Sequence, residues 1–399
     1  MVTGAEVRVG LLPAANQLAK VPAVQMCDGP VRTGTGSGEE RPMTVARLHH
    51  RPEHDSVAPA CSRACHTPGI VRTGVAFSGG LPPADIVECV KLAEELGYES
   101  AWVAEGHGGD QFAILGACAV ATRRILLGTA ISSVFVRSAP TIGMAAATVD
   151  HLSRGRFILG LGSSHRVQVE PEHGIPFVQP TARLRDTIGI VRALLADGVV
   201  SYRGETVTIE RFDLWFPPRR PSIPLYVAAL FPRMLEIAGE LSQGVLLTWP
   251  THKAIARAIE HLAIGARQAG RKPSEVDVAS LIPCAVADTA AAARDLMRPA
   301  VGLYAGFFPR YNRLLAETGF GDAVHAIKAA YDRGGREAAA KVVPDELIDA
   351  VALAGTPDTC RERLAAYRRA GLALPIVSPR VSGADAKKTA MAAIRACAP

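Results

Sequence analysis

A carboxylate and an imidazole lie close together in the segment EGHGGD, residues 105–110. Glu105 and His107 are residue types that position a substrate or exchange a proton with it, and the glycines beside them permit a tight turn. The alternative is a polar loop in which Asp110 caps the next helix. We favour a functional role, because binding and catalytic residues gather on loops carried by a rigid scaffold.

A second polar segment, GSSHR, begins at Gly162 and continues through Ser163 and Ser164. It follows an apolar stretch in which glycine occupies the alternate positions 160 and 162. Glycine inside a strand is typical of a close approach by a ligand or by another backbone. The hydroxyl and basic groups that follow can bind phosphate or another polar group. A solvated loop with a helix cap is an equally favoured alternative.

A helix is expected to begin at Pro232, in the segment AALFPR that spans residues 228–233. Proline is favoured in the first helical turn, where its missing N–H group would have no partner. The free N–H groups of such a turn bind anions, and Arg233 adds a positive charge. The signal is weak by itself, because any turn that leads into a helix offers the same groups.

Small residues and one arginine make up the segment SSVFVRSAP, residues 132–140. Small side chains such as Ser132 would let a planar ring approach the sheet. Arg137 is able to meet a carboxylate or a phosphate. The alternative is that Arg137 is an ordinary surface arginine.

Each of these segments follows a stretch with strand character, and helical patterns separate the strands. Strands are expected at residues 72–77, 100–105, 125–131, 156–161, 224–229, 244–248, 276–286 and 374–378. Alternation of strands and helices predicts a parallel sheet covered by helices. Eight strands indicate a closed (β/α)8 TIM barrel, since a doubly wound sheet usually has five or six. The barrel places its binding and catalytic groups at the C-terminal ends of its strands.

Three irregularities interrupt the cycle of strands and helices. The helix after strand 156–161 is delayed until about residue 181, and a hairpin is expected at residues 199–202 and 206–210. Helical patterns near 322–333 and 345–353 predict an insertion between the seventh and eighth strands, at the mouth of the barrel. Aromatic residues in and beside this insertion either line a pocket or pack it onto the barrel: Tyr304, Phe307, Phe308, Tyr311 and Phe320.

Residues 1–70 differ from the barrel region 71–399 in composition. They are rich in Gly, Pro, Ser, Thr, Arg and His and show no sustained period, which predicts a disordered extension. This region contains a group of potential zinc ligands: His49, His50, His54, Cys61, Cys65 and His66. Their spacing fits no standard zinc module, so we predict no metal site.

Composition narrows the class of protein. Of the 399 residues, 48% are apolar and 21% are charged, the net charge is +6, and the arginines are spread along the chain, which argues against a nucleic-acid surface. No run reaches the roughly 18 apolar residues of a membrane span. The eight cysteines lie at irregular spacings, which favours reduced thiols in a cytoplasm. A cytoplasmic enzyme acting on a small molecule fits these features.

The region 71–380 resembles the bacterial luciferase-like superfamily, which holds FMN-dependent monooxygenases and coenzyme F420-dependent reductases. Four segments carry the resemblance, in matching order and spacing: LGYESAWVAE, LLGTAISSVFVRSAP, LSRGRFILGLGSS and IPLYVAALFPRMLEIAGELSQGVLLTW. The methylenetetrahydromethanopterin reductase-like branch is the most similar, through the ALFP turn and the AGE helix. Relatives are commonly dimers, so the resemblance implies a homodimer.

The resemblance assigns site residues. It implies coenzyme F420 or FMN at the strand mouths, and a cis peptide bond between Ala130 and Ile131 that forms a bulge behind the ring. Glu105 matches the acidic position after the second strand. The phosphate end of the cofactor would meet the turn made by Ala229, Leu230, Phe231 and Arg233.

Three positions depart from the pattern of the family. Many relatives carry histidine directly after the acidic position, where this chain has Gly106, with His107 one residue later. Many also carry histidine before the proline of segment 132–140, where this chain has Ala139. A glutamate proposed as proton donor in some F420 enzymes is replaced by Ser163 or Ser164. The proton-transfer residue is therefore left open.

The leading hypothesis is hydride transfer between F420, or a reduced flavin, and a small organic substrate. An FMN-dependent monooxygenase that acts with molecular oxygen is one alternative, and a non-catalytic flavin-binding barrel is another. A metal-dependent hydrolase barrel is disfavoured, because the segments after the strands lack the histidines and aspartates of a metal-ligand set.

Overall fold

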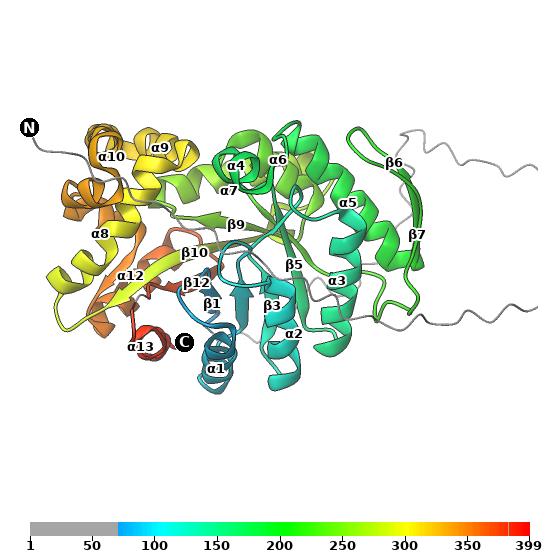
Figure 1. Ribbon diagram of the computed structural model, residues 1–399, viewed down its shortest axis with the longest axis horizontal. Helices are drawn as coiled ribbons and strands as arrows, with labels where there is room; N and C mark the ends of the chain where they lie inside the picture. The colour runs from blue at the N-terminus through cyan, green and yellow to red at the C-terminus, as the bar shows by residue number, and fades with distance from the viewer. Residues whose placement is uncertain (1–70, 382) are drawn as a thin grey trace, which may run out of the picture. The chain divides into compact units, whose positions relative to one another are not determined.

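The computed structural model describes residues 71–381 and 383–399 (Figure 1). The predicted disordered extension, and the histidines and cysteines within it, lie outside the described residues. The described part is dominated by eight parallel strands that form a closed barrel, with helices around it. The predicted TIM barrel is therefore confirmed.

The barrel strands occur in the ring order β1-β2-β3-β5-β8-β9-β10-β12, and β12 pairs with β1 to close the ring. All of these pairings are parallel, as expected for strands connected by helices. The bounds of the eight strands are β1 Gly74–Phe77, β2 Ser100–Val103, β3 Leu126–Thr129, β5 Phe157–Gly162, β8 Leu225–Ala228, β9 Gly244–Thr248, β10 Asp277–Val286 and β12 Leu374–Pro379.

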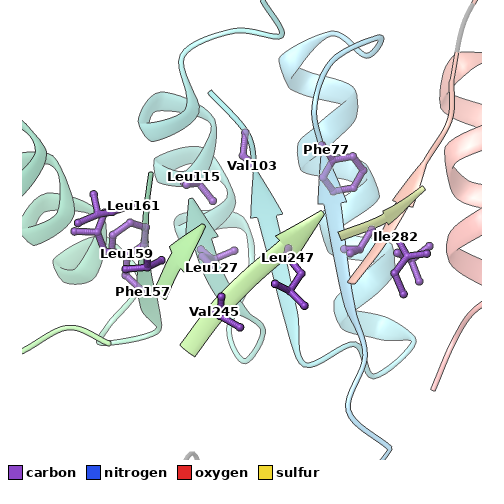
Figure 2. Close-up of a cluster of buried hydrophobic side chains, with 14 of the residues drawn as sticks. Phe77, Val103, Leu115, Leu127, Phe157, Leu159, Leu161, Val245, Leu247 and Ile282 are labelled. Atoms are coloured by element: carbon purple, nitrogen blue, oxygen red, sulfur yellow. The ribbon is translucent and has the colours of Figure 1, made fainter. Parts of the chain in front are cut away.

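Side chains alternate between two buried layers along each strand, because successive residues of a strand point to opposite faces. The outer layer lies between the strands and the helices and includes Phe77, Leu127 and Leu247 (Figure 2). The inner layer fills the barrel and includes Trp102 and Tyr226, whose ring centroids lie 5.4 Å apart. The apolar strand patterns thus encode a packed barrel interior that is not a pore.

Helices surround the barrel strands and alternate with them along the chain. Their bounds are α1 Pro83–Glu95, α2 Gln111–Ala121, α3 Ala139–Leu152, α4 Arg166–His173, α5 Pro180–Asp197, α6 Pro232–Leu241, α7 His252–Gln268, α8 Ala290–Phe307, α9 Pro309–Leu315, α10 Gly321–Lys341, α11 Asp345–Val351, α12 Pro357–Arg369 and α13 Ala386–Ala396.

The structure corrects the sequence interpretation at two places. Helix α4 lies in the segment that we expected to be a loop before the delayed helix α5, and its signal is weak because it is short and contains Pro171. The third strand ends at Thr129, and a short strand, β4 (Ser132–Ser133), continues its path beside β5. The expected hairpin is present as β6 (Val199–Arg203) and β7 (Thr208–Asp213), which form an antiparallel pair.

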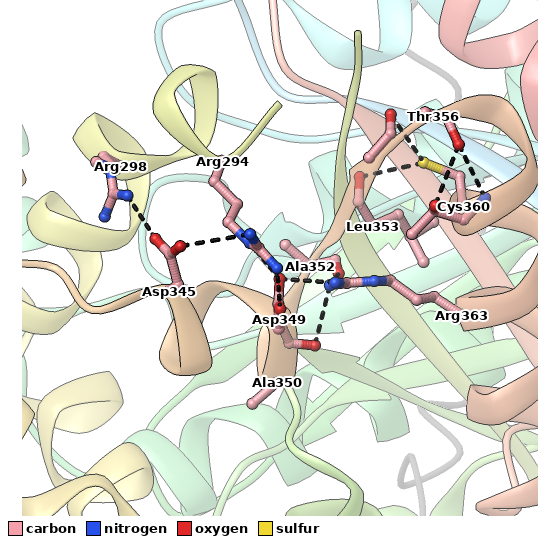
Figure 3. Close-up of polar contacts among 12 residues, drawn as sticks. Arg294, Arg298, Asp345, Asp349, Ala350, Ala352, Leu353, Thr356, Cys360 and Arg363 are labelled. Carbon is pink, nitrogen blue, oxygen red and sulfur yellow. Dashed lines mark hydrogen bonds and ion pairs between the residues drawn. The ribbon is translucent and has the colours of Figure 1, made fainter. Parts of the chain in front are cut away.

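The predicted insertion is present and consists of helices α9 to α11, beyond the helix α8 that follows the seventh strand. It is followed by β11 (Leu353–Gly355), which pairs with the end of β10. A buried apolar cluster joins α8 to α10 and α11. Ion pairs attach it to the barrel, since the carboxylate of Asp349 on α11 lies 2.7 Å from Arg294 on α8 and 2.6 Å from Arg363 on α12 (Figure 3). The insertion is thereby held at the barrel by both packing and charge.

Candidate active site

A cavity of about 300 Å³ opens at the C-terminal mouth of the barrel. Every one of the eight barrel strands contributes to its wall, through strand ends and the turns that follow them. Its lining includes Ser78, Ala104, Glu105, Gly106, His107, Ala130, Ile131, Ser163, Ser164, His165, Ala228, Ala229, Leu230, Phe231, Thr248, Trp249, Pro283, Tyr304, Phe308, Arg310, Tyr311, Ser378 and Arg380. This is the location that the barrel fold predicts for a functional site.

Most of the site residues expected from the sequence line this one cavity. They are Glu105, His107, Ala130, Ile131, Ser163, Ser164, Ala229, Leu230 and Phe231. Four others lie outside its wall. Ser132 is buried in β4, Gly162 is buried at the end of β5, Arg233 is exposed in the first turn of α6, and Arg137 faces a neighbouring surface groove.

Arg137 forms ion pairs with two carboxylates of its own chain. Its Nε lies 2.5 Å from Glu105 Oε1, and its Nη2 lies 2.5 Å from Asp110 Oδ2. Burial opposes the charge, but these hydrogen bonds raise the pKa of Arg137 above its ordinary value. Asp110 also accepts a hydrogen bond from the N–H of Ala113, so it caps α2, as the alternative interpretation of this loop predicted. The guanidinium is thus occupied by Glu105 and Asp110.

Glu105 is held from two sides. Besides the pair with Arg137, its Oε2 accepts a hydrogen bond of 2.9 Å from the N–H of Ser133. His107 is more accessible, since 79% of its side chain is exposed and its Nε2 lies 3.2 Å from Glu172 Oε2. Glu105 is therefore fixed in position, whereas His107 stands at the rim of the cavity.

The alternating glycines of β5 admit the backbone of the neighbouring strand. A Cβ atom at Gly160 would lie 2.0 Å from the carbonyl oxygen of Thr129, and one at Gly162 would lie 2.8 Å from Ile131 Cγ1. The bond between Ala130 and Ile131 is cis, as the resemblance implied. Gly162 therefore lies directly behind Ile131, which lines the cavity.

Aromatic side chains also line the cavity, and several of them come from the insertion or lie beside it. The ring centroids of Trp249 and Tyr304 lie 4.4 Å apart, and those of Tyr304 and Tyr311 lie 4.9 Å apart. Phe308 belongs to the same aromatic group. Of the aromatic residues named from the sequence, Tyr304, Phe308 and Tyr311 both line the cavity and pack in the buried cluster of the insertion. Phe307 and Phe320 do not line the cavity.

His165 is a cavity residue of the segment GSSHR, which the sequence predicted either as a binding loop for phosphate or another polar group or as a solvated loop. It precedes α4, and its ring lies 5.0 Å from that of Phe308 and 5.3 Å from that of Tyr311. Burial, together with the nearby charge of Arg310, lowers the pKa of His165 to about 4. The imidazole is therefore neutral near pH 7, when it can donate one hydrogen bond and accept another.

The sequence interpretation did not single out two further cavity residues, Arg310 and Arg380. Arg310 lies on the insertion, and no strand pattern marks its position. Arg380 directly follows β12, so the rule that binding groups follow barrel strands would have found it.

Within the described residues, one group of side chains has the composition and spacing to hold a metal ion. Its members are Cys284, Cys360 and Cys397, whose sulfur atoms lie within 4.8 Å of one another in the buried outer layer. The carbonyl oxygens of Leu353 and Gly355 lie 3.6 and 3.8 Å from Cys360 Sγ, where they can accept from a protonated thiol. We interpret the group as packed thiols, consistent with buried cysteine acting as a small hydrophobe.

Comparison with known proteins identifies the family. Residues 61–374 match the family model described as luciferase-like monooxygenase. The chain belongs to this family. The resemblance seen in four sequence segments is thus confirmed, and family membership makes the chain an enzyme.

The similar relatives are named as reductases or as an F420-dependent oxidoreductase. The chain is 31% identical to a 5,10-methylenetetrahydromethanopterin reductase of Methanolobus tindarius, over 73% of this chain and 89% of the relative. It is 30% identical to the enzyme of the same name from Archaeoglobus fulgidus, over 80% and 96%. A putative coenzyme F420-dependent oxidoreductase of Mycobacterium tuberculosis is 30% identical, over 76% and 92%.

Solved structures share the fold. The coenzyme F420-dependent tetrahydromethanopterin reductase of Methanopyrus kandleri superposes with a TM-score of 0.74 at 26% identity, covering 82% of this chain and 98% of that one. A type II Baeyer-Villiger monooxygenase of Pseudomonas putida, in complex with FMN, has a TM-score of 0.60 at 17% identity, covering 82% and 96%, and shows the fold alone. Among residues 71–381 and 383–399, no helix combines the length and apolar character needed to cross a membrane.

Proposed function

We propose that this chain transfers a hydride between coenzyme F420 and a small organic substrate, with a reduced flavin as the alternative cofactor. The observation that carries the proposal is the cavity at the strand mouths, whose wall combines small residues with aromatic rings. Relatives that are 30–31% identical over most of their length are reductases or are named for F420, which favours F420 over FMN.

The cavity wall fits a planar ring system. Small side chains line the cavity at several strand ends, namely Ser78, Ala104, Gly106, Ala130, Ser163, Ala228 and Ala229. Larger side chains at these positions would occupy the space of a flat ligand. When bound, F420 or a reduced flavin supplies the hydride, and the protein supplies orientation and electrostatics.

We assign the phosphate end of the cofactor to the turn before α6. Phe231 is the N-cap residue of α6, and it provides no side-chain cap for the first N–H groups. Free N–H groups at a helix start favour an anion, and Arg233 in the first turn adds positive charge. Ala229 and Leu230 keep this end of the cavity apolar.

We assign different roles to Glu105 and His107. Glu105 is held by Arg137 and by the N–H of Ser133, so it positions the turn after β2 and accepts hydrogen bonds at a fixed place. His107 lies at the rim and is largely exposed, so it is free to reach a substrate and exchange a proton with it.

Cofactor titration tests the proposal. We expect the purified chain to bind F420 with a measurable change in fluorescence, and to bind FMN more weakly. Ala104→Leu would place a larger side chain in the cavity and should weaken binding at least 10-fold. Ala121→Leu is the matched control, because Ala121 is exposed at the end of α2 and should leave the affinity unchanged. Binding of neither cofactor by the unsubstituted chain would refute the proposal.

The monooxygenase alternative is separated by its need for oxygen. A hydride transferase should oxidise reduced F420 with an organic acceptor under anaerobic conditions. A monooxygenase should instead require reduced FMN and consume oxygen in proportion to product.

We further propose a cytoplasmic homodimer, for which native mass spectrometry should give twice the 42.0 kDa mass of the chain.

A further inference from the structure

We propose that Ser78, Ser378 and Arg380 bind a carboxylate or phosphate group of the substrate. This inference rests on the proposed function, because it divides one cavity between a cofactor and a substrate. The three residues belong to the ends of β1 and β12, which are paired neighbours in the barrel. They would place the anionic end of the substrate across the mouth from the phosphate of the cofactor.

Arg380 carries a guanidinium that the described residues leave without a counter-charge. Its Nε is buried and has no hydrogen-bond partner in the described structure, and no carboxylate there forms an ion pair with its guanidinium. Its backbone is fixed, since the N–H of Arg380 donates a hydrogen bond of 2.7 Å to the carbonyl oxygen of Cys284. Burial and the like charge of Arg336 both lower the pKa of Arg380 from its ordinary value.

Some other partly buried arginines of the described chain have carboxylate partners, whereas Arg156 and Arg368 donate to carbonyl and hydroxyl oxygens. Arg72 lies between Glu99 and Asp277, and Arg294 binds Asp349. A buried cation without a partner is costly, because its hydration is lost and not replaced. Arg380 therefore differs from Arg72 and Arg294, which are paired with carboxylates. An anion bound from outside the protein would supply the missing counter-charge.

The two serines add uncharged donors on the same side of the mouth. Ser378 lies near the end of β12 and Arg380 directly follows this strand, and both line the cavity. Ser78 follows β1, the strand paired with β12. A Cβ atom at Gly80 would lie 3.0 Å from the carbonyl oxygen of Val381, so the loop after β1 packs against the residue that follows Arg380. Hydroxyl groups beside a guanidinium are typical donors to carboxylate and phosphate.

The charges in the cavity wall also favour an anion. Among the described residues that line it, Glu105 is the one carboxylate, and it is bound to Arg137. His165 is neutral near pH 7, and burial raises the pKa of Tyr304 and Tyr311. Arg310 adds a second positive charge at the insertion side. The wall therefore presents positive charge that the protein does not neutralise.

The strand order separates this group from the expected phosphate end of the cofactor. In the ring, β12 is three strands from β8 by way of β10 and β9, and four strands from β5 by way of β1, β2 and β3. The proposed cofactor phosphate lies after β8, at the start of α6. Because eight strands make the ring, a separation of three or four strands places Arg380 on the far side of the mouth.

The test is a titration of the full chain, without cofactor, with inorganic phosphate and with malonate at constant ionic strength. Calorimetry should show saturable binding to the unsubstituted chain. Arg380→Gln should weaken it at least 10-fold, and Arg380→Lys should weaken it less, because lysine keeps the charge. Arg267→Gln is the matched control, since this arginine is exposed near the end of α7 and its substitution should leave binding unchanged.

Cofactor binding by the same variants shows whether Arg380 binds the phosphate of the cofactor or an anionic group of the substrate. Arg380→Gln should leave the Kd of F420, FMN and riboflavin within 2-fold of the unsubstituted chain. Weaker binding of FMN with unchanged binding of riboflavin would mean that Arg380 serves the cofactor phosphate, and it would overturn the inference. Unchanged binding of phosphate and malonate by Arg380→Gln would also overturn it.

Thermal unfolding separates a binding role from a structural one. Removing an unpartnered buried charge should keep or raise Tm, so a lower Tm in Arg380→Gln with unchanged anion binding would indicate structural support and contradict the inference. If neither cofactor binds the unsubstituted chain, the proposed function fails, while the anion titration still decides whether this subsite exists.

Discussion

Glu105 and His107 lie two residues apart, yet their surroundings differ. Glu105 is enclosed by Arg137 and Ser133, while His107 reaches solvent and Glu172. The sequence predicted both as candidates from residue type and from their place after a strand. It did not distinguish their roles, because Arg137 lies 32 residues from Glu105 along the chain.

Substitution of these two residues tests their roles. We expect His107→Ala to lower kcat by about 100-fold, because general acid–base groups contribute roughly 10²–10⁴-fold. Glu105→Gln should lower kcat/KM about 10-fold, since the amide keeps an acceptor for Ser133 but loses the pair with Arg137. The measurement is anaerobic oxidation of reduced F420 with a panel of acceptors. Unchanged rates in both variants would favour the non-catalytic alternative.

His165 should make the folded chain sensitive to acid. Histidine in the unfolded chain titrates near 6.5, whereas burial lowers the pKa of His165 to about 4 in the folded chain. Between these values the unfolded chain binds a proton that the folded chain does not, so stability falls as the pH is lowered. The loss due to this group is on the order of 2 kcal/mol at pH 5.

Urea unfolding at pH 7 and pH 5 measures this effect. The unsubstituted chain should lose more stability between the two pH values than His165→Gln, in which the titrating group is absent. Equal losses in both proteins would show that burial does not shift the pKa of His165.

Strand β5 illustrates how one element shapes the site. Thr129 Oγ1 accepts a hydrogen bond from the N–H of Gly160 and donates one to its carbonyl oxygen, both at 2.8 Å. These contacts require the backbones of β3 and β5 to lie close together at this point. The glycines at 160 and 162 were interpreted from the sequence as a sign of close approach, and the structure shows that the approaching group at Gly160 is a neighbouring backbone.

Gly160→Ala should lower the free energy of unfolding by about 2–3 kcal/mol, because forced overpacking in a core costs roughly that much. The new Cβ would lie 2.0 Å from the carbonyl oxygen of Thr129, which cannot move without disturbing β3. Gly116→Ala in α2 is the control, since its nearest neighbour would be at 3.7 Å and alanine favours a helix. Chemical unfolding should show equal or higher stability for the control, and equal losses in both variants would contradict the argument.

The closed barrel depends on contacts between segments that are distant in the chain. At the base, Arg72 lies before β1 and binds Glu99 before β2 and Asp277 at the start of β10, with nitrogen–oxygen distances of 2.6 to 2.9 Å. Tyr226 on β8 donates a hydrogen bond of 2.7 Å to the same Asp277. Burial opposes the charge of Arg72, but the hydrogen bonds that it donates to both carboxylates raise its pKa. These contacts link four barrel strands.

Arg72→Met should lower the free energy of unfolding by about 3–5 kcal/mol, because removing one partner of a buried ion pair leaves the other charge uncompensated. Lys91→Met is the control, since the pair between Lys91 and Glu88 is exposed and should contribute less than about 1 kcal/mol. Urea unfolding of both variants measures the difference. A loss below 1 kcal/mol for Arg72→Met would mean that the base network is not needed to close the barrel.

The sequence by itself determined the order of the strands and helices, because alternating apolar patterns and helix caps are local properties. It also placed Glu105, Ile131, Ser163 and Phe231 at strand ends, which in a parallel barrel meet at one mouth. Helix α4 escaped this reasoning, since a short helix with an internal proline has a weak period.

Only the tertiary structure decided what each polar side chain contacts. Arg137 was a candidate for cofactor binding until the structure paired it with Glu105 and Asp110. Arg380 was overlooked, and the fold leaves its buried Nε without a partner at the mouth of the barrel. The reason is physical: a charged side chain binds whatever the fold brings within about 3 Å, and those partners come from segments that sequence periodicity does not connect.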